Sequence, residues 1–156
     1  MATPFGMLGI RAGGGYVTRI AFLRRRGAEV APADALAERV WRQIEGYLAD
    51  PGYRFSLPLA EIGTPFQRRV WGAIAAIPPG CTRTYGAIAS ELGSSARAVG
   101  QACGENPYPL VVPCHRVVSS SGIGGFAHSA EGYLPGVKLW LLAHERDVDR
   151  TGGAAG

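Results

Sequence analysis

Apolar residues recur at helical spacing in two long segments of the chain. Residues 33–49 carry large apolar side chains at every fourth position before Asp50-Pro51-Gly52, which predicts an amphipathic helix that ends there. A second helix is predicted to begin at Pro65, because Thr64 can cap the free amides and proline has no N–H to lose. The apolar stripes of the two helices are Leu36, Val40, Trp41, Ile44 and Leu48, and Phe66, Val70, Trp71, Ile74 and Ile77.

Strand patterns surround the first helix. Residues 5–11 and 16–23 are strand-like and are separated by the glycine-rich segment 12–15, which predicts a hairpin. Residues 53–59 are predicted to form a third strand, followed by a linker over 60–63. We therefore expect a small α/β domain over residues 1–60.

Two short helices are predicted over residues 84–92 and 96–103, joined by Gly93-Ser94-Ser95, as in a helix-turn-helix. The second helix begins with small residues around the single long cation Arg97. Small residues let a helix approach another surface closely, although an ordinary helix with one surface arginine explains the pattern equally well. These helices belong to a second predicted domain over residues 61–150, and residues 151–156 are expected to form a flexible tail.

Composition limits the class of protein. The 156 residues suffice for one ordinary domain or for a small module beside a moderate one. No apolar run approaches the roughly 18 residues of a membrane span, and the N-terminus lacks the pattern of a signal peptide, so we expect a cytoplasmic protein without a membrane partner. Three cysteines without a CxxC pair indicate neither a disulfide framework nor a metal site. The net charge of +4 is compatible with a phosphate-bearing partner but is weak evidence for one.

The most informative run is residues 113–118, in which Cys114 stands directly before His115. The thiolate is the nucleophilic form of cysteine, and an adjacent imidazole can take its proton. Apolar residues 110–112 and 117–118 predict that the pair lies between two buried strand-like pieces. A lone buried cysteine is more often inert packing. Here the polar His115 and Arg116 favour a nucleophile, because a plain core strand would not tolerate them.

Several motifs occur together in one order along residues 64–145, and together they resemble the O6-alkylguanine-DNA alkyltransferase family. The resemblance is close there and loose over the N-terminal residues. It implies a small RNase H-like α/β module followed by a mainly helical domain with a helix-turn-helix. The motifs are Thr64-Pro65-Phe66-Gln67, Thr84-Tyr85-Gly86, Ala96-Arg97-Ala98-Val99-Gly100, Asn106-Pro107, Pro113-Cys114-His115-Arg116-Val117-Val118 and Trp140-Leu141-Leu142-Ala143-His144-Glu145.

The resemblance also implies a role for each site residue. Cys114 would accept the alkyl group from guanine O6, His115 would draw off the thiol proton through a water, and Glu145 would orient the imidazole. Tyr85 would serve the departing base and help turn the nucleotide, and the backbone near Val117 would read the guanine amino group. The remaining implied residues are Asn106 as the hinge to the active-site segment, Arg97 as the finger that fills the base stack, and Ser95, Ala96, Ala98 and Gly100 as DNA contacts.

This reaction needs the damaged nucleotide outside the duplex, because O6 of a paired guanine lies within the stack. A small-residue helix suits the narrow minor groove. The product is a thioether, so one molecule would repair one lesion and be consumed. The implied partner is double-stranded DNA that contains O6-alkylguanine, bound by a monomer without cofactor or metal; cooperative binding on DNA is left open.

The sequence departs from the family between the nucleophile and the last helix. Residues 125–139 are a few residues longer than the usual segment, and Leu139 replaces the acid after Lys138. In the family this segment forms one wall of the alkyl pocket, for which Phe126, Ala127 and Lys138 are the candidates. Because residues 125–137 hold several glycines and few aliphatic side chains, we expect them to be the most mobile part of the second domain.

Three other functions share some of these features. A protein that binds alkylated DNA without transfer has another residue where Cys114 stands, which argues against that function. A helix-turn-helix regulator would not explain Cys114, His115 or Glu145. A cysteine hydrolase needs an oxyanion hole and turns over repeatedly. The stoichiometry of methyl transfer from DNA to protein separates these possibilities.

Overall fold

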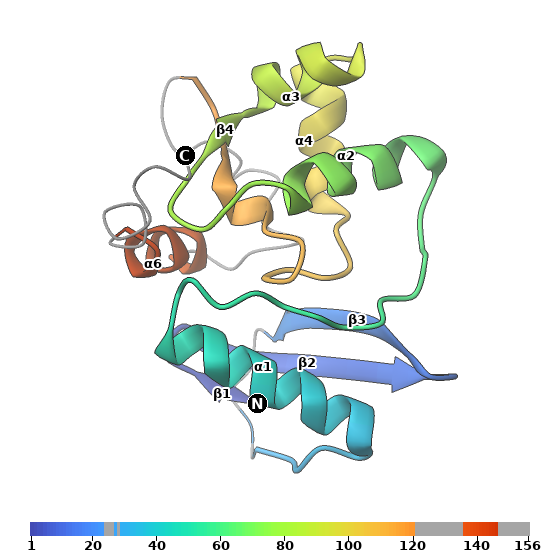
Figure 1. Cartoon of the computed structure of the whole chain (residues 1–156), viewed down its shortest axis with the longest axis vertical. Helices are drawn as coiled ribbons and strands as arrows, with labels where there is room; N and C mark the ends of the chain where they lie inside the picture. The colour runs from blue at the N-terminus through green and yellow to red at the C-terminus, as the bar shows by residue number, and fades with distance from the viewer. Residues whose placement is uncertain (24–26, 28, 121–135, 147–156) are drawn as a thin grey trace. The chain divides into compact units, whose positions relative to one another are not determined.

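The structure is a computed structural model that describes residues 1–23, 27, 29–120 and 136–146. The chain divides into two compact units, residues 1–61 and residues 62–156 (Figure 1). The expected boundary at residues 60 and 61 lies at the same linker. The expected tail over residues 151–156 lies outside the described residues.

The first unit is an antiparallel sheet with one helix. Its strands lie in the order β1-β2-β3, and β2 and β3 form the predicted hairpin from Met7 opposite Leu23 to Gly13 opposite Tyr16. Gly14 and Gly15 turn the chain with φ of +61° and +84°, which only glycine adopts at little cost. The elements are β1 (Ala2–Thr3), β2 (Gly6–Gly13), β3 (Tyr16–Leu23) and α1 (Ala35–Ala49).

Helix α1 ends at the predicted residue and begins two residues later than predicted, and its buried face only partly matches the predicted stripe. Asp34 caps it by accepting a hydrogen bond from the Ala37 amide, and Asp50 follows its last residue. Val40 and Ile44 are fully buried, whereas Leu36 and Leu48 are only half-buried. A spacing of four residues advances about 40° beyond each full turn, so the ends of such a stripe rotate off the core. Ala37 and Tyr47 complete the buried face instead.

The predicted strand over residues 53–59 is wrong. Within the first unit this segment pairs with the sheet only through an isolated parallel bridge between Val17 and Leu59. The Val17 amide donates to the Pro58 carbonyl, and the Ala60 amide donates to the Val17 carbonyl. Pro58 lacks the N–H that a longer ladder requires. The segment therefore crosses the sheet edge without becoming part of it.

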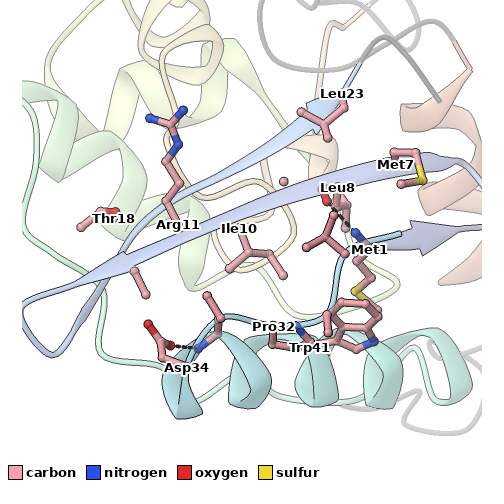
Figure 2. Close-up of a pocket in the computed structure, with 16 residues that line it drawn as sticks. Met1, Met7, Leu8, Ile10, Arg11, Thr18, Leu23, Pro32, Asp34 and Trp41 are labelled. Atoms are coloured by element: carbon pink, nitrogen blue, oxygen red, sulfur yellow. Dashed lines mark hydrogen bonds between the residues drawn. The ribbon is translucent and has the colours of Figure 1, made fainter. Parts of the chain in front are cut away.

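A cavity of about 570 Å³ lies between the sheet and α1 within the first unit (Figure 2). Leu8, Ile10 and Trp41 are among its lining residues, which are mostly apolar, and Arg11 and Asp34 also line it. The Met1 amino group donates to the Leu8 carbonyl at 2.9 Å, and this bond ties the chain's first residue to β2.

The second unit is mainly helical. Thr64 and Gln67 form a capping box at the start of its first helix, as the Thr64-Pro65 signal predicts. The predicted apolar stripe of that helix is buried from Val70 to Ile77. The elements are α2 (Pro65–Ala75), β4 (Arg83–Thr84), α3 (Tyr85–Leu92), α4 (Ala96–Gly104), the 3₁₀ helix η1 (Cys114–Arg116), β5 (Val117–Val118) and α6 (Val137–His144).

Helices α3 and α4 pack against each other across a tight turn (Figure 1). Gly93 ends α3 in the left-handed region with φ of +65°, and Ser95 caps α4 by accepting from the Ala98 amide. On the other side of α4, the Trp71 indole donates to the Ala102 carbonyl at 2.8 Å, which fastens α4 to α2. The two short helices occupy the predicted residues.

A short parallel pairing joins the α3–α4 pair to the segment that carries Cys114. Arg83 lies opposite Val117 and Thr84 opposite Val118 in the β4–β5 ladder. On the other side of Cys114 the predicted strand over residues 110–112 is wrong, because Leu110 adopts φ of +77° within a turn. Cys114 therefore lies between a turn and a two-residue strand.

Candidate active site and DNA-binding face

Cys114 is the first residue of η1 and is only 3% exposed. The Asn106 side-chain amide donates to Cys114 Sγ at 3.3 Å and to the Val112 carbonyl at 2.8 Å. The other end of that amide, Oδ1, accepts from the Tyr108 backbone N–H at 2.9 Å. Asn106 thus fixes the turn before the thiol and contacts the sulfur directly, in the place where the resemblance put a hinge.

Glu145 lies at the end of α6 and is bound by two side chains of η1. His115 Nε2 lies 2.7 Å from Glu145 Oε2. Arg116 donates through Nε to Oε1 at 2.8 Å and through Nη2 to Oε2 at 2.9 Å, a bidentate pair. His115, Arg116 and Glu145 are all buried. The structure therefore brings together the predicted histidine and acid and adds an arginine to them.

The charges of this cluster follow from its contacts. Burial alone would raise the pKa of Glu145, but the hydrogen bonds from His115 and Arg116 lower that pKa well below its usual range. Burial lowers the pKa of His115, and this effect outweighs the neighbouring Glu145 carboxylate, which raises it. Glu145 is accordingly an anion at neutral pH, and His115 is neutral and able to accept a proton.

The Cys114 thiol is protonated at rest. Burial is the largest cause of a pKa well above the ordinary value of a thiol, and a hydrogen bond with Cys103 raises it further. The Asn106 hydrogen bond and the Lys138 charge act in the opposite direction but do not outweigh burial. A base must therefore remove the proton before the sulfur can act as a nucleophile.

Lys138 connects α6 to the start of α3. Its ammonium donates to the Val117 carbonyl at 2.7 Å and to the Tyr85 hydroxyl at 3.4 Å, and it lies 5.6 Å from the centre of the Tyr85 ring. Burial raises the pKa of Tyr85 well above its usual range, so its hydroxyl remains a hydrogen-bond donor. The Lys138, Tyr85 and Val117 predicted for the substrate site therefore meet at one place.

A cavity of about 450 Å³ opens between α3, α4 and the end of β5. Arg97 is exposed at its border, and a Cβ placed on Gly100 would meet the Tyr85 ring at 4.0 Å. Of the predicted DNA contacts, Ser95 and Ala98 form the cap of α4 nearby. The lining residues are Thr84, Tyr85, Gly86, Ala96, Arg97, Gly100, Ser119 and Ser120.

Two site residues were not assigned a role from the sequence. Arg116 is polar where a core strand would be apolar, and its bidentate bond to Glu145 is what makes its burial possible. Nothing in the sequence around Cys103 indicates a role, but its thiol forms a hydrogen bond with that of Cys114. A helical position does not reveal such a contact, because it depends on where the later turn places Cys114.

Some expectations lie beyond what the structure describes. Phe126 and Ala127, assigned to the alkyl pocket, and the expected mobility of residues 125–137 fall mainly in the undescribed segment 121–135. In the described ranges, no three or more His, Cys, Asp or Glu side chains come together as a metal site would need. No described helix is long and apolar enough to cross a membrane.

The buried ion pair between Arg116 and Glu145 predicts that replacing Arg116 destabilises the fold strongly. Arg116→Met keeps the side-chain length but leaves the Glu145 carboxylate without its bidentate partner, so the free energy of unfolding should fall by about 3–5 kcal/mol. Arg83→Met is the matched control, because the side chains of the Arg83–Glu91 pair at 3.2 Å are 34% and 54% exposed and surface pairs contribute less than about 1 kcal/mol. Urea unfolding measures both values, and equal losses would contradict this account.

Stability should also depend on pH in a defined direction. The pKa values of Glu145 and His115 are lowered in the folded state, so below about 4.5 and 6.5 the unfolded chain takes up protons that the folded chain excludes. The free energy of unfolding should therefore decrease as the pH falls through this range. Urea unfolding below about pH 4.5 should show a shallower dependence in Glu145→Gln, and an unchanged one in the exposed-carboxylate control Glu91→Gln.

Comparison with known proteins gives the family. The sequence model of the 6-O-methylguanine DNA methyltransferase DNA-binding domain matches residues 65–147. A methylated-DNA–protein-cysteine methyltransferase of Mycobacterium leprae is 39% identical over 155 residues, which cover 94% of this chain and 90% of that protein. The constitutive enzyme of that name from Bacillus subtilis is 44% identical over 108 residues, or 67% of this chain.

Coverage differs among these relatives. The chain spans 63% of the Bacillus protein and 61% of the probable methyltransferase of Acanthamoeba polyphaga mimivirus. The crystal structure of Mycobacterium tuberculosis OGT in complex with DNA is similar with a TM-score of 0.77 at 34% identity, covering 94% of this chain and 91% of that one. With a family match over more than half of its residues and a relative aligned along nearly all of it, the chain belongs to the 6-O-methylguanine DNA methyltransferase family.

Proposed function

We propose that this protein repairs DNA by transferring an alkyl group from O6 of guanine to Cys114, once per protein molecule. The observation that carries the proposal is the buried hydrogen bond between His115 and Glu145, directly beside the buried thiol of Cys114. It is supported by the family, whose relatives are named methylated-DNA–protein-cysteine methyltransferases. No cofactor is needed, because the nucleophile and the base are both side chains of this chain.

The transfer begins with the thiol proton. His115 Nε2 is held by Glu145, so Nδ1 is the ring nitrogen that takes the proton of Cys114, directly or through a water. The sulfur then attacks the alkyl carbon, a C–S bond forms, and the C–O6 bond breaks. Glu145 stabilises the imidazolium that results, as the acid does in hydrolytic triads.

The departing guanine carries the electron pair of the broken bond. The Tyr85 hydroxyl, which keeps its proton, can donate to the leaving base. Lys138 adds a positive charge beside Tyr85 and the Val117 carbonyl. We assign the guanine to the space between these residues and Cys114. The thioether that remains on the protein is stable to water and thiols, which makes the reaction single-turnover.

DNA recognition is assigned to α3 and α4, acting as a helix-turn-helix in the minor groove. The cavity of about 450 Å³ beside Tyr85 is the entry for an extruded nucleotide. Exposed Arg97 at its border is the side chain that fills the gap left in the base stack. Small side chains at Ala96 and Gly100 allow the backbone of α4 to approach the duplex closely.

The proposal extends to the first unit, the oligomeric state, the DNA partner and the place of action. The sheet and helix of the first unit are assigned to an RNase H-like module that accompanies the transfer domain. The protein would act as a monomer on double-stranded DNA that contains O6-alkylguanine. Its place of action would be the cytoplasm, where bacterial DNA lies; the family includes bacterial relatives.

A binder of alkylated DNA without transfer is the second candidate. Its recognition surface would be the same, but it would not need a buried thiol in contact with Asn106 and followed directly by His115. The presence of Cys114 therefore favours transfer over binding alone.

The assignment of Cys114 predicts a separation of chemistry from binding. Cys114→Ser should abolish transfer, because a hydroxyl is far less ionised than a thiol, whereas duplex binding should persist through α4 and its phosphate contacts. The measurement is transfer of labelled methyl from DNA to protein, with a gel-shift assay for binding. Cys81→Ser is the matched control and should transfer one methyl per molecule. Stoichiometric transfer in Cys114→Ser would refute the assignment.

Arg97 should matter only when a base must be extruded. Arg97→Ala should slow the repair of duplex lesions much more than the reaction with free O6-benzylguanine, because free base needs no extrusion. Arg68→Ala, which removes an exposed positive charge from α2, is the control for net charge. Second-order rate constants on both substrates test this prediction, and equal slowing on both would assign Arg97 to the fold or the chemistry.

A further inference from the structure

A second thiol faces the candidate acceptor. Cys103 lies in the last turn of α4, and its side chain forms a hydrogen bond with Cys114. Gly100, three residues earlier in α4, lies beside Tyr85, because a Cβ placed on it would meet the Tyr85 ring at 4.0 Å. Residues three apart share a helix face, so Cys103 lies on the face of α4 that is turned towards Tyr85. All three cysteines of the chain are free thiols in the structure.

The local geometry holds these two cysteines together. The Asn106 backbone N–H donates to the Cys103 carbonyl at 3.2 Å, while the Asn106 side chain donates to Cys114 Sγ at 3.3 Å. One residue is thus fixed to both cysteines, through the backbone of the first and the sulfur of the second. Cys103 is half-buried, whereas Cys114 is 3% exposed, so solvent reaches the pair through Cys103.

We infer that Cys103 and Cys114 form a redox pair, in which oxidation joins them in a disulfide that reversibly blocks alkyl transfer. The inference rests on the proposed role of Cys114 as the acceptor. The oxidant class is a peroxide. One thiolate attacks a peroxide oxygen, which forms a sulfenic acid and releases hydroxide, and the second thiol then attacks the sulfenic sulfur and expels water. Two thiols and one hydrogen peroxide thus give one disulfide and two waters, and a dithiol reductant reverses the step.

Such a pair has a chemical benefit for a protein that uses its nucleophile once. A lone oxidised cysteine proceeds from the sulfenic to the sulfinic acid, which common thiols do not reduce. A neighbouring thiol intercepts the sulfenic acid first and stores the sulfur as a disulfide. The acceptor is then recovered when reducing conditions return. Cys103 and Cys114 are eleven positions apart, so the pair cannot be recognised from a CxxC pattern in the sequence.

The test compares the intact protein with Cys103→Ser and Cys81→Ser. Cys81 is the matched control, because it is also half-buried but belongs to the segment after α2, where its amide donates to the Pro78 carbonyl. Each reduced protein is first assayed for methyl transfer, which sets its own baseline. It is then exposed to a small excess of hydrogen peroxide, mapped by mass spectrometry, and assayed again before and after treatment with dithiothreitol.

The expected result is a peptide cross-link between Cys103 and Cys114 in the intact protein and in Cys81→Ser, with a mass loss of two hydrogen atoms. Both proteins should lose transfer on oxidation and regain their baseline on reduction. Cys103→Ser should instead accumulate sulfinic acid at Cys114 and regain little activity. A cross-link to Cys81, an intermolecular cross-link, or the same recovery in Cys103→Ser as in the intact protein would overturn the inference. A disulfide at the expected pair without any transfer by the reduced protein would refute the proposed function alone.

Discussion

The buried carboxylate of Glu145 is the constraint on which the second unit depends. It accepts a bidentate pair from Arg116 and contacts His115, so the end of α6 is fixed to η1 by three hydrogen bonds. Arg116 extends the same network by donating to the Ile77 carbonyl just after α2. A charge removed from water is stable only when every partner is in place. The contacts of Glu145 that join α6 to η1 therefore also fix the position of the His115 imidazole. The arrangement of His115 and Glu145 exists only when α6 is packed against η1.

The sequence predicts the elements of this unit well because their ends carry local signals. Thr64, Thr84 and Ser95 cap helices by bonds within their own first turns, and Gly93 ends α3 by its own conformation. These features depend on nearest neighbours alone. The meeting of His115 with Glu145 is not local, since 30 residues separate them. Family resemblance, and not spacing, indicated that contact.

The elements that were predicted wrongly depend on long-range or backbone constraints and not on local signals. Residues 110–112 are β-branched or aliphatic and favour a strand, but Asn106 binds the Val112 carbonyl and forces a turn in which Leu110 takes a positive φ. Residues 53–59 lose strand pairing to Pro58, and the buried face of α1 rotates away from a strict spacing of four. In each case a long-range or backbone constraint overrides side-chain preference. The Cys103–Cys114 contact escaped notice because it depends on that same turn.

Thr84 belongs to two elements at once. Its backbone pairs with Val118 in the β4–β5 ladder, and its hydroxyl caps α3, which begins at the next residue. No residue stands between the strand and the helix to serve as a flexible joint. The α3–α4 pair and the segment that carries Cys114 are consequently coupled rigidly, and rotating one without the other would break the ladder or the cap. Under the proposed function, most of the motion that brings a lesion to the sulfur must therefore be made by the nucleic acid.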